Sequence, residues 1–243
     1  MQGGLHGDEL GSTEGMLYLA KKILADENYN KLLDDIELAI IPMANIDGYL
    51  KENRYSKNGL DLNRDQTKLM APETLVLKKA LVNFNPEVVI DFHEYRPYRR
   101  DYAMIGDFGV TGYHDVMFLY SGNYNIPRNI RDITNNVFVA NARNELDGYQ
   151  LTTYPYYTSD DYKGNVVFNQ GSISSRSSAT NNALSNTISI LVEVRGVGLG
   201  KKSYNRRVFS TFITAISFLK TAIENKLKIK EELSKSQIKK VIL

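Results

Sequence analysis

Short runs of β-branched and aliphatic residues alternate along this chain with longer segments whose apolar residues recur at helical spacing. The clearest run is Thr187–Val194 (TISILVEV), and Val88–Phe92 (VVIDF) is a second. Runs this apolar are typical of strands that are buried on both faces. Segments such as Ser12–Leu24 have the amphipathic pattern of helices. The 243 residues therefore predict a single α/β domain, residues 1–243, with a mixed, mostly parallel β-sheet and helices on both faces.

Other segments complete the predicted order of elements. We expect Ile36–Ile41 (IELAII) to form another buried strand and Pro127–Leu146 to be helical, and a last amphipathic helix begins near Tyr204. The segment from Arg96 to Gln170 is rich in tyrosine, glycine and asparagine. It is predicted to form loops that flank the 127–146 helix and wall a cleft.

The net charge of +2 conceals a basic segment that begins at Lys201. Its lysines gather toward the end of the last helix, where the helix dipole favours positive charge, and no aromatic residues alternate with them. Residues 204–243 are therefore interpreted as a solvated C-terminal helix and basic tail, with no nucleic-acid partner. No run approaches the length of about 20 apolar residues that a membrane span needs.

Metal ligands in this chain must come from His, Asp or Glu, because it has no cysteine. His6 and Glu9 lie in GGLHGDE, a glycine-rich turn directly before a predicted helix. These two residues alone are equally typical of a surface loop. His93 is expected at the carboxyl end of a buried strand, where sites form in α/β sheets. Two His and one Glu leave a fourth position open for water, which is the composition of a catalytic site with one Zn²⁺.

Glu193 interrupts the apolar run of its strand near the carboxyl end. An acid at such a position usually needs a partner or a function. Arg195 lies two residues further on, on the same face of the strand, and could be that partner. A structural ion pair and a catalytic carboxylate are therefore both open interpretations.

Several short motifs follow one another in an order that is known from one family. They are HGDE, NIDG, ENR, LDLNRD, DFHE and VEVRG, and they extend from Gly3 to about Gly198. An ordered set of motifs is far more specific than any single one. On these residues the chain resembles the carboxypeptidase A-like zinc carboxypeptidases, in a form similar to a bacterial branch of the family. The resemblance implies a zinc-dependent hydrolase that removes the C-terminal residue of a peptide.

The resemblance also implies a role for each matching residue at the metal. His6, Glu9 and His93 would be the zinc ligands, and Asp61 would be the carboxylate that orients a ligand imidazole. Glu193 would be the general base, which takes a proton from the activated water and passes it to the leaving amine.

Further residues would act on the substrate, a peptide or cell-wall peptide with a free C-terminal carboxylate. The resemblance implies that Arg54 stabilises the oxyanion, and that Asn63 and Arg64 hold the terminal carboxylate. Ion pairs at the surface and hydrogen bonds within turns are the alternatives for these residues. Arg176, in the polar loop before the Thr187–Val194 strand, either faces the cleft or lies at the surface.

Two features depart from the family. No tyrosine occurs between Tyr162 and Tyr204, so the family's mobile tyrosine is missing or replaced; four tyrosines of the preceding loop are weak candidates for cleft walls, namely Tyr154, Tyr156, Tyr157 and Tyr162. Only Met1–Leu5 precede His6, too few for the strand that family members have there. We therefore expect an N-terminally incomplete domain that lacks the first strands, with an exposed sheet edge and His6 and Glu9 on a fraying terminus. No signal peptide is visible, although the resemblance implies a secreted or periplasmic protein.

Two rival functions stay open at the level of the sequence. One is a zinc amidohydrolase of the aspartoacylase and succinylglutamate desuccinylase type, which acts on N-acyl amino acids and shares several of the same motifs. The ENR and NIDG motifs and the long last helix favour the peptidase. The other is an inactive, truncated peptidase that only binds peptide.

Overall fold

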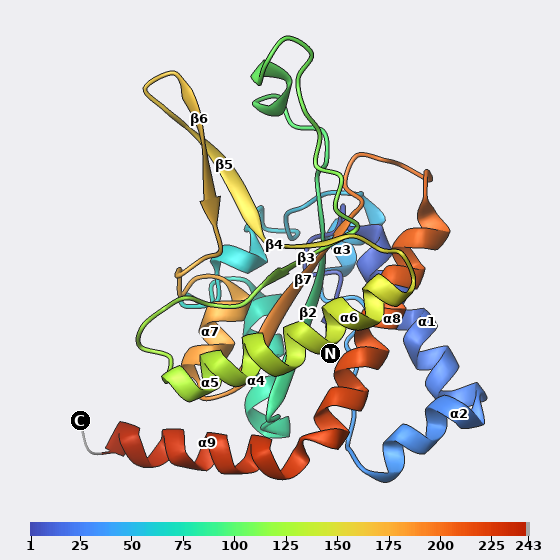
Figure 1. Ribbon diagram of the computed structural model, residues 1–243, viewed down its shortest axis with the longest axis vertical. Helices are drawn as coiled ribbons and strands as arrows, with labels where there is room; N and C mark the ends of the chain where they lie inside the picture. Colours follow the sequence, from blue (N-terminus) through green and yellow to red (C-terminus); the bar gives the residue numbers. More distant parts are fainter. Residues whose placement is uncertain (242–243) are drawn as a thin grey trace.

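A five-stranded sheet forms the centre of the computed structural model, which describes residues 1–241 (Figure 1). In spatial order its strands are β1 (Gln2–Gly3), β2 (Val88–Tyr95), β7 (Ile188–Arg195), β3 (Val116–Leu119) and β4 (Thr153–Pro155). The pairs β1–β2, β2–β7 and β3–β4 are parallel, and β3 is antiparallel to β7. The predicted mixed, mostly parallel sheet is confirmed.

Helices surround this sheet. They are α1 (Leu10–Ala25), α2 (Glu27–Asn30), α3 (Ile46–Leu50), α4 (Pro72–Phe84), α5 (Arg128–Ile133), α6 (Ala140–Gly148), α7 (Ser178–Leu184), α8 (Tyr204–Glu224) and α9 (Lys226–Val241). A π-helical segment, Thr134–Val139, joins α5 to α6, so the predicted helix over 127–146 is present. The last helix begins at Tyr204 as predicted but is interrupted at Asn225, and the final two residues of the basic tail lie outside the described residues. None of the helices described in residues 1–241 is both long and apolar enough to cross a bilayer.

The two faces of the sheet have different roles because successive side chains of a strand alternate between them. On one face, Ile190 and Val192 of β7 belong to the main hydrophobic core, together with α8 residues such as Phe212. On the other face lie Glu193 and, at the same position on β2, His93. Figure 1 shows α1 and α8 on the first side and α7 on the second. The clustered polar residues thus lie on the α7 side of the sheet.

The N-terminal segment is held more firmly than predicted. Gln2 and Gly3 pair with Asp91 and Phe92 of β2, so the expectation that no strand precedes His6 is wrong. The Met1 ammonium donates to a backbone oxygen across this segment, the carbonyl of Ala39, at 2.7 Å. His6 and Glu9 are each only 2% exposed, so they do not lie on a fraying terminus. Backbone hydrogen bonds on both sides of β1 hold the short segment in place.

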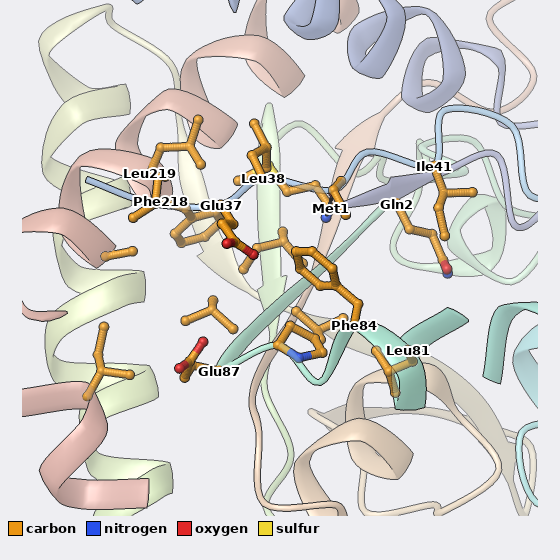
Figure 2. A pocket seen from close by; sticks show the side chains of 18 of the residues that line it. Met1, Gln2, Glu37, Leu38, Ile41, Leu81, Phe84, Glu87, Phe218 and Leu219 are labelled. Carbon is orange, nitrogen blue, oxygen red and sulfur yellow. Dashed lines mark hydrogen bonds between the residues drawn. The ribbon is translucent and has the colours of Figure 1, made fainter. Parts of the chain in front are cut away.

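The predicted strand at Ile36–Ile41 is not formed. This segment is only partly buried, and its β-pairing with the sheet is limited, among the described residues, to one bridge, Gln2 to Ile41, beside the two-residue strand β1. Between this segment and the unpaired edge of β2 at Val88–Ile90 lies an open groove of about 720 Å³. Figure 2 shows apolar side chains around the groove, including Phe84, Leu38 and Leu219. None of the predicted metal ligands lines it.

The segment from Arg96 to Gln170 contains more than the predicted loops and helix. It supplies β3 and β4 to the sheet and a separate hairpin of β5 (Tyr157–Tyr162) and β6 (Asn165–Gln170). The hairpin projects beyond the sheet, beside the loop that follows β2 (Figure 1). The two sheet strands have four and three residues, which is too short for an alternating pattern to be recognised in the sequence.

Candidate metal centre

The HGDE turn is built on close backbone contacts that only glycine permits. A Cβ atom on Gly7 would lie 1.9 Å from the carbonyl carbon of Gly48. Gly48 is in turn fixed by the first residue of the NIDG motif, since its N–H donates to Oδ1 of Asn45 at 3.0 Å. The NIDG motif therefore holds Gly48 in place against Gly7 of the turn. The turn then directs His6 and Glu9 toward β2.

Three ligand atoms converge where this turn meets β2. The Nδ1 atom of His6 lies 2.6 Å from Oε1 of Glu9, and Nδ1 of His93 lies 2.8 Å from Oε2 of Glu9. The two Nδ1 atoms are 3.1 Å apart. All three side chains are buried, and they form a group that could hold a metal ion. Two ligands of a tetrahedral zinc ion at about 2.1 Å lie roughly 3.4 Å apart, so a small adjustment would accommodate the ion.

Each imidazole is supported by a carboxylate on its other nitrogen. Nε2 of His6 lies 3.1 Å from Oδ1 of Asp61, and Nε2 of His93 lies 2.9 Å from Oδ2 of Asp91. This arrangement leaves both Nδ1 atoms to face the centre, as in carboxylate–histidine–metal triads. Asp61 was predicted from the sequence, and Asp91 was not. The signal for Asp91 was its position two residues before His93 on a strand, which places both side chains on one face.

The charges of the three ligands depend on one another. Burial alone would raise the pKa of Glu9, but the positive charges and hydrogen bonds of His6 and His93 lower it. Burial would lower the pKa of each imidazole; Glu9 and Asp61 reverse this effect at His6, and Asp91 and Glu9 reverse it at His93. In the metal-free protein, the raised pKa values of the two imidazoles favour their protonated forms beside the ionised carboxylate of Glu9. A divalent cation bound by the same atoms would replace these protons, so the donor set fits zinc.

Glu193 lies beside His93 in the sheet and is not neutralised by a neighbour. Its Oε2 atom is buried and has no hydrogen-bond partner among the described residues. Burial and, second, the negative charge of Glu9 raise the pKa of Glu193 to about 7. Arg195 is directed to Asp115, 3.1 Å away, so the alternative of a Glu193–Arg195 ion pair is wrong. Glu193 therefore has a carboxyl oxygen without a hydrogen-bond partner among the described residues, next to His93 in the sheet.

Arg54 reaches the same place from the loop after α3. Its Nε and Nη2 atoms contact Oδ2 of Asp61 at 3.0 and 2.9 Å. Its Nη1 atom lies 3.3 Å from Nδ1 of His6 and 3.7 Å from Oε1 of Glu9. The guanidinium thus borders the metal-binding atoms.

The other predicted substrate-binding residues lie nearby but are less tightly placed. Asn63 is buried and its Oδ1 accepts a hydrogen bond from Ser178 N–H at 2.7 Å, which leaves its Nδ2 group to donate to a ligand. Arg64 is exposed, and its Nη1 donates to the carbonyl oxygen of Asn63 at 2.8 Å. Arg176 is exposed and is not drawn into the cluster by any hydrogen bond to the described residues.

One tyrosine of the loop segment belongs to this neighbourhood. Tyr156 packs on a small apolar cluster with Leu119, Ala179 and Leu191, on the face of the sheet that bears Glu193. Burial and, after it, the charge of Glu193 raise the pKa of Tyr156. In the sequence this residue was not distinguishable from the three other tyrosines around it.

Comparisons with known proteins point in one direction. Residues 1–79 match the family model described as zinc carboxypeptidase. Carboxypeptidase 2 of Trichophyton rubrum is 28% identical over 227 residues, which cover 93% of this chain and 42% of that protein. A probable carboxypeptidase 2 of Arthroderma benhamiae is 27% identical over the same length, with 43% of that protein covered. The chain therefore spans less than half the length of these relatives.

Solved structures share the fold. A metallo-carboxypeptidase from Burkholderia cenocepacia superposes with a TM-score of 0.65 at 15% identity, over 91% of this chain and 56% of that one. The carboxypeptidase A from Helicoverpa armigera gives a TM-score of 0.64 at 17% identity, over 92% of this chain and 60% of that one. The fold is thus that of the carboxypeptidase-like α/β proteins. In its first 79 residues and in its fold, the chain is thus similar to zinc carboxypeptidases.

Proposed function

We propose that this protein is a zinc-dependent carboxypeptidase that hydrolyses the C-terminal peptide bond of peptides. One observation carries the proposal: the two Nδ1 atoms and the Glu9 carboxylate converge within hydrogen-bonding distance of one another, beside a Glu193 oxygen that has no partner among the described residues. A purely structural cluster would be expected to satisfy every buried oxygen.

Zinc held by His6, Glu9 and His93 would polarise the scissile carbonyl and lower the pKa of a bound water toward about 7. Glu193 then takes the proton of the attacking water on its free oxygen and transfers it to the leaving nitrogen. A pKa near 7 suits both steps, because the group must accept and release the same proton. Added positive charge from the metal would lower this pKa and favour the ionised base.

Arg54 acts on the carbonyl oxygen. Its Nη1 group borders the ligand atoms, and Asp61 fixes the rest of the guanidinium. It can therefore donate to the negative charge that develops on that oxygen in the transition state.

Asn63 and Arg64 provide the selectivity for chain ends. The free Nδ2 group of Asn63 and the exposed guanidinium of Arg64 can both donate to a terminal carboxylate. Internal peptide bonds offer no such group. The substrate would thus be a peptide with a free C-terminus, either from proteins or from the cell wall.

The test is hydrolysis of matched peptide pairs that differ only in a free or an amidated C-terminus. The zinc-loaded protein is expected to release the last residue of the free peptide and to leave the amidated one intact. Arg64→Ala should reduce kcat/KM for the free peptide through KM. Equal cleavage of both peptides would contradict the assignment of Asn63 and Arg64. Hydrolysis of N-acyl amino acids in place of peptides would favour the amidohydrolase instead.

A further inference from the structure

Asp91 is the centre of a buried hydrogen-bond network behind the metal ligands. It is 1% exposed and accepts hydrogen bonds from three different parts of the chain. Nε2 of His93 and Oγ of Ser178 both contact its Oδ2 atom, and Nε2 of Gln2 contacts its Oδ1 atom at 3.0 Å. Strand β1, strand β2 and the first residue of α7 therefore meet at one carboxylate.

We propose that Ser178 is a positioning residue for the metal centre, acting through Asp91 on His93. The Ser178 hydroxyl and the imidazole share one carboxylate oxygen, so the hydroxyl fixes the direction from which that oxygen receives the Nε2 proton. Orientation of the ring then determines where Nδ1 points. Without the hydroxyl, Gln2 and His93 itself would be the remaining hydrogen-bond donors to the carboxylate among the described residues.

The hydroxyl of Ser178 is available for this role because it has no local task. The N-cap position of α7 is Ser177, and the Ser178 side chain bonds outside its own helix. The backbone N–H of Ser178 donates to Oδ1 of Asn63 at 2.7 Å. One residue thus supports a metal ligand through its side chain and a substrate-binding residue through its backbone. Replacing the side chain by alanine separates these two functions.

The inference rests on the metal centre of the proposed function, and the experiment distinguishes the two. Ser178→Ala removes the hydroxyl that contacts Asp91. Ser177→Ala is the matched control: its hydroxyl is also buried, but it donates to the carbonyl oxygen of Ser174, 3.0 Å away. Asp91→Asn removes the charge that both donors share. Thermal unfolding checks that each variant is folded.

The first measurement is zinc affinity by competition with a chelating dye. Loss of an outer partner of a metal ligand typically weakens binding by about 10- to 100-fold. We expect roughly tenfold weaker binding for Ser178→Ala, toward the upper end of that range for Asp91→Asn, and no change for Ser177→Ala.

The second measurement is the proton NMR signal of His93 Nε2–H in the metal-free protein, which does not depend on zinc. A downfield, slowly exchanging signal is expected in the unaltered protein and in Ser177→Ala. In Ser178→Ala the signal should move and exchange faster. If Ser178→Ala matches Ser177→Ala in both measurements, the inference is overturned. If the unaltered protein binds no zinc, the proposed function fails, and the NMR signal still decides the role of Ser178.

Discussion

At the residue scale, the candidate metal ligands could be singled out because each one carries a local signal. His6 and Glu9 share a glycine-rich turn, and His93 follows a clear apolar run. Ser178 was missed because its importance arises only from its contact with Asp91, 87 positions away in the sequence. The pairing of Arg195 with Asp115 in place of Glu193 likewise depends on the antiparallel strand β3, which was not predicted from the sequence.

Glu193→Gln tests the proposed general base directly. The amide has the same shape but cannot accept a proton from water, so turnover is expected to fall by about 10²- to 10⁴-fold, the usual contribution of acid–base catalysis. Zinc content should stay at that of the unaltered protein, because Glu193 is not among the ligand atoms. Peptide hydrolysis and elemental analysis on the same samples provide both values. A variant that keeps its activity would remove Glu193 from the mechanism.

At the scale of elements, the long strands β2 and β7 and the amphipathic helices were predictable from their patterns. The short strands β1, β3 and β4 were not, since each exists only because a longer neighbour pairs with it. The buried ion pair that joins α8 to β2 was likewise not predictable from the sequence. Arg207 is 2% exposed, and its Nε and Nη2 atoms each lie 2.5 Å from an oxygen of Glu94.

This ion pair is also linked to the metal centre. The Glu94 carboxylate accepts a hydrogen bond from the backbone N–H of Gly11 at the start of α1. The backbone N–H of Glu94 donates to Oε2 of Glu9 at 3.1 Å. A Cβ atom on Gly196 would lie 2.0 Å from Oε1 of Glu94, so glycine is required after β7 to make room for the pair. The pair thus fixes α1, β2 and α8 around the candidate ligand Glu9.

Arg207→Met should therefore destabilise the protein strongly. Removing one partner leaves the Glu94 carboxylate buried without its countercharge, which typically costs about 3–5 kcal/mol. Arg128→Met is the matched control, because Arg128 is 87% exposed and pairs with Asp132 one helical turn away; its effect should stay within about 0.5 kcal/mol. Urea unfolding gives the free energy of unfolding of each. Similar values for both variants would show that the buried pair adds no stability.

At the scale of the whole molecule, the charges of the metal centre predict opposite pH trends with and without zinc. In the metal-free protein, Glu193 keeps its proton up to a pKa of about 7, whereas the unfolded chain releases it near 4.5. Between these values the unfolded state binds fewer protons, so the free energy of unfolding falls as the pH rises. The raised pKa values of His6 and His93 act in the same direction.

Zinc reverses the trend because it binds the deprotonated imidazoles, so its affinity and the stability it adds grow with pH. Thermal unfolding between about pH 5 and pH 8, with chelator and with excess zinc, should therefore give melting temperatures that diverge as the pH increases. Glu193→Gln should reduce the slope of the metal-free curve between about pH 4.5 and pH 7, since one of the titrating groups is gone, while the zinc-dependent increment persists. If zinc stabilised the protein equally at all of these pH values, its binding would not displace protons from His6 and His93, and the assignment of these imidazoles as ligands would be wrong.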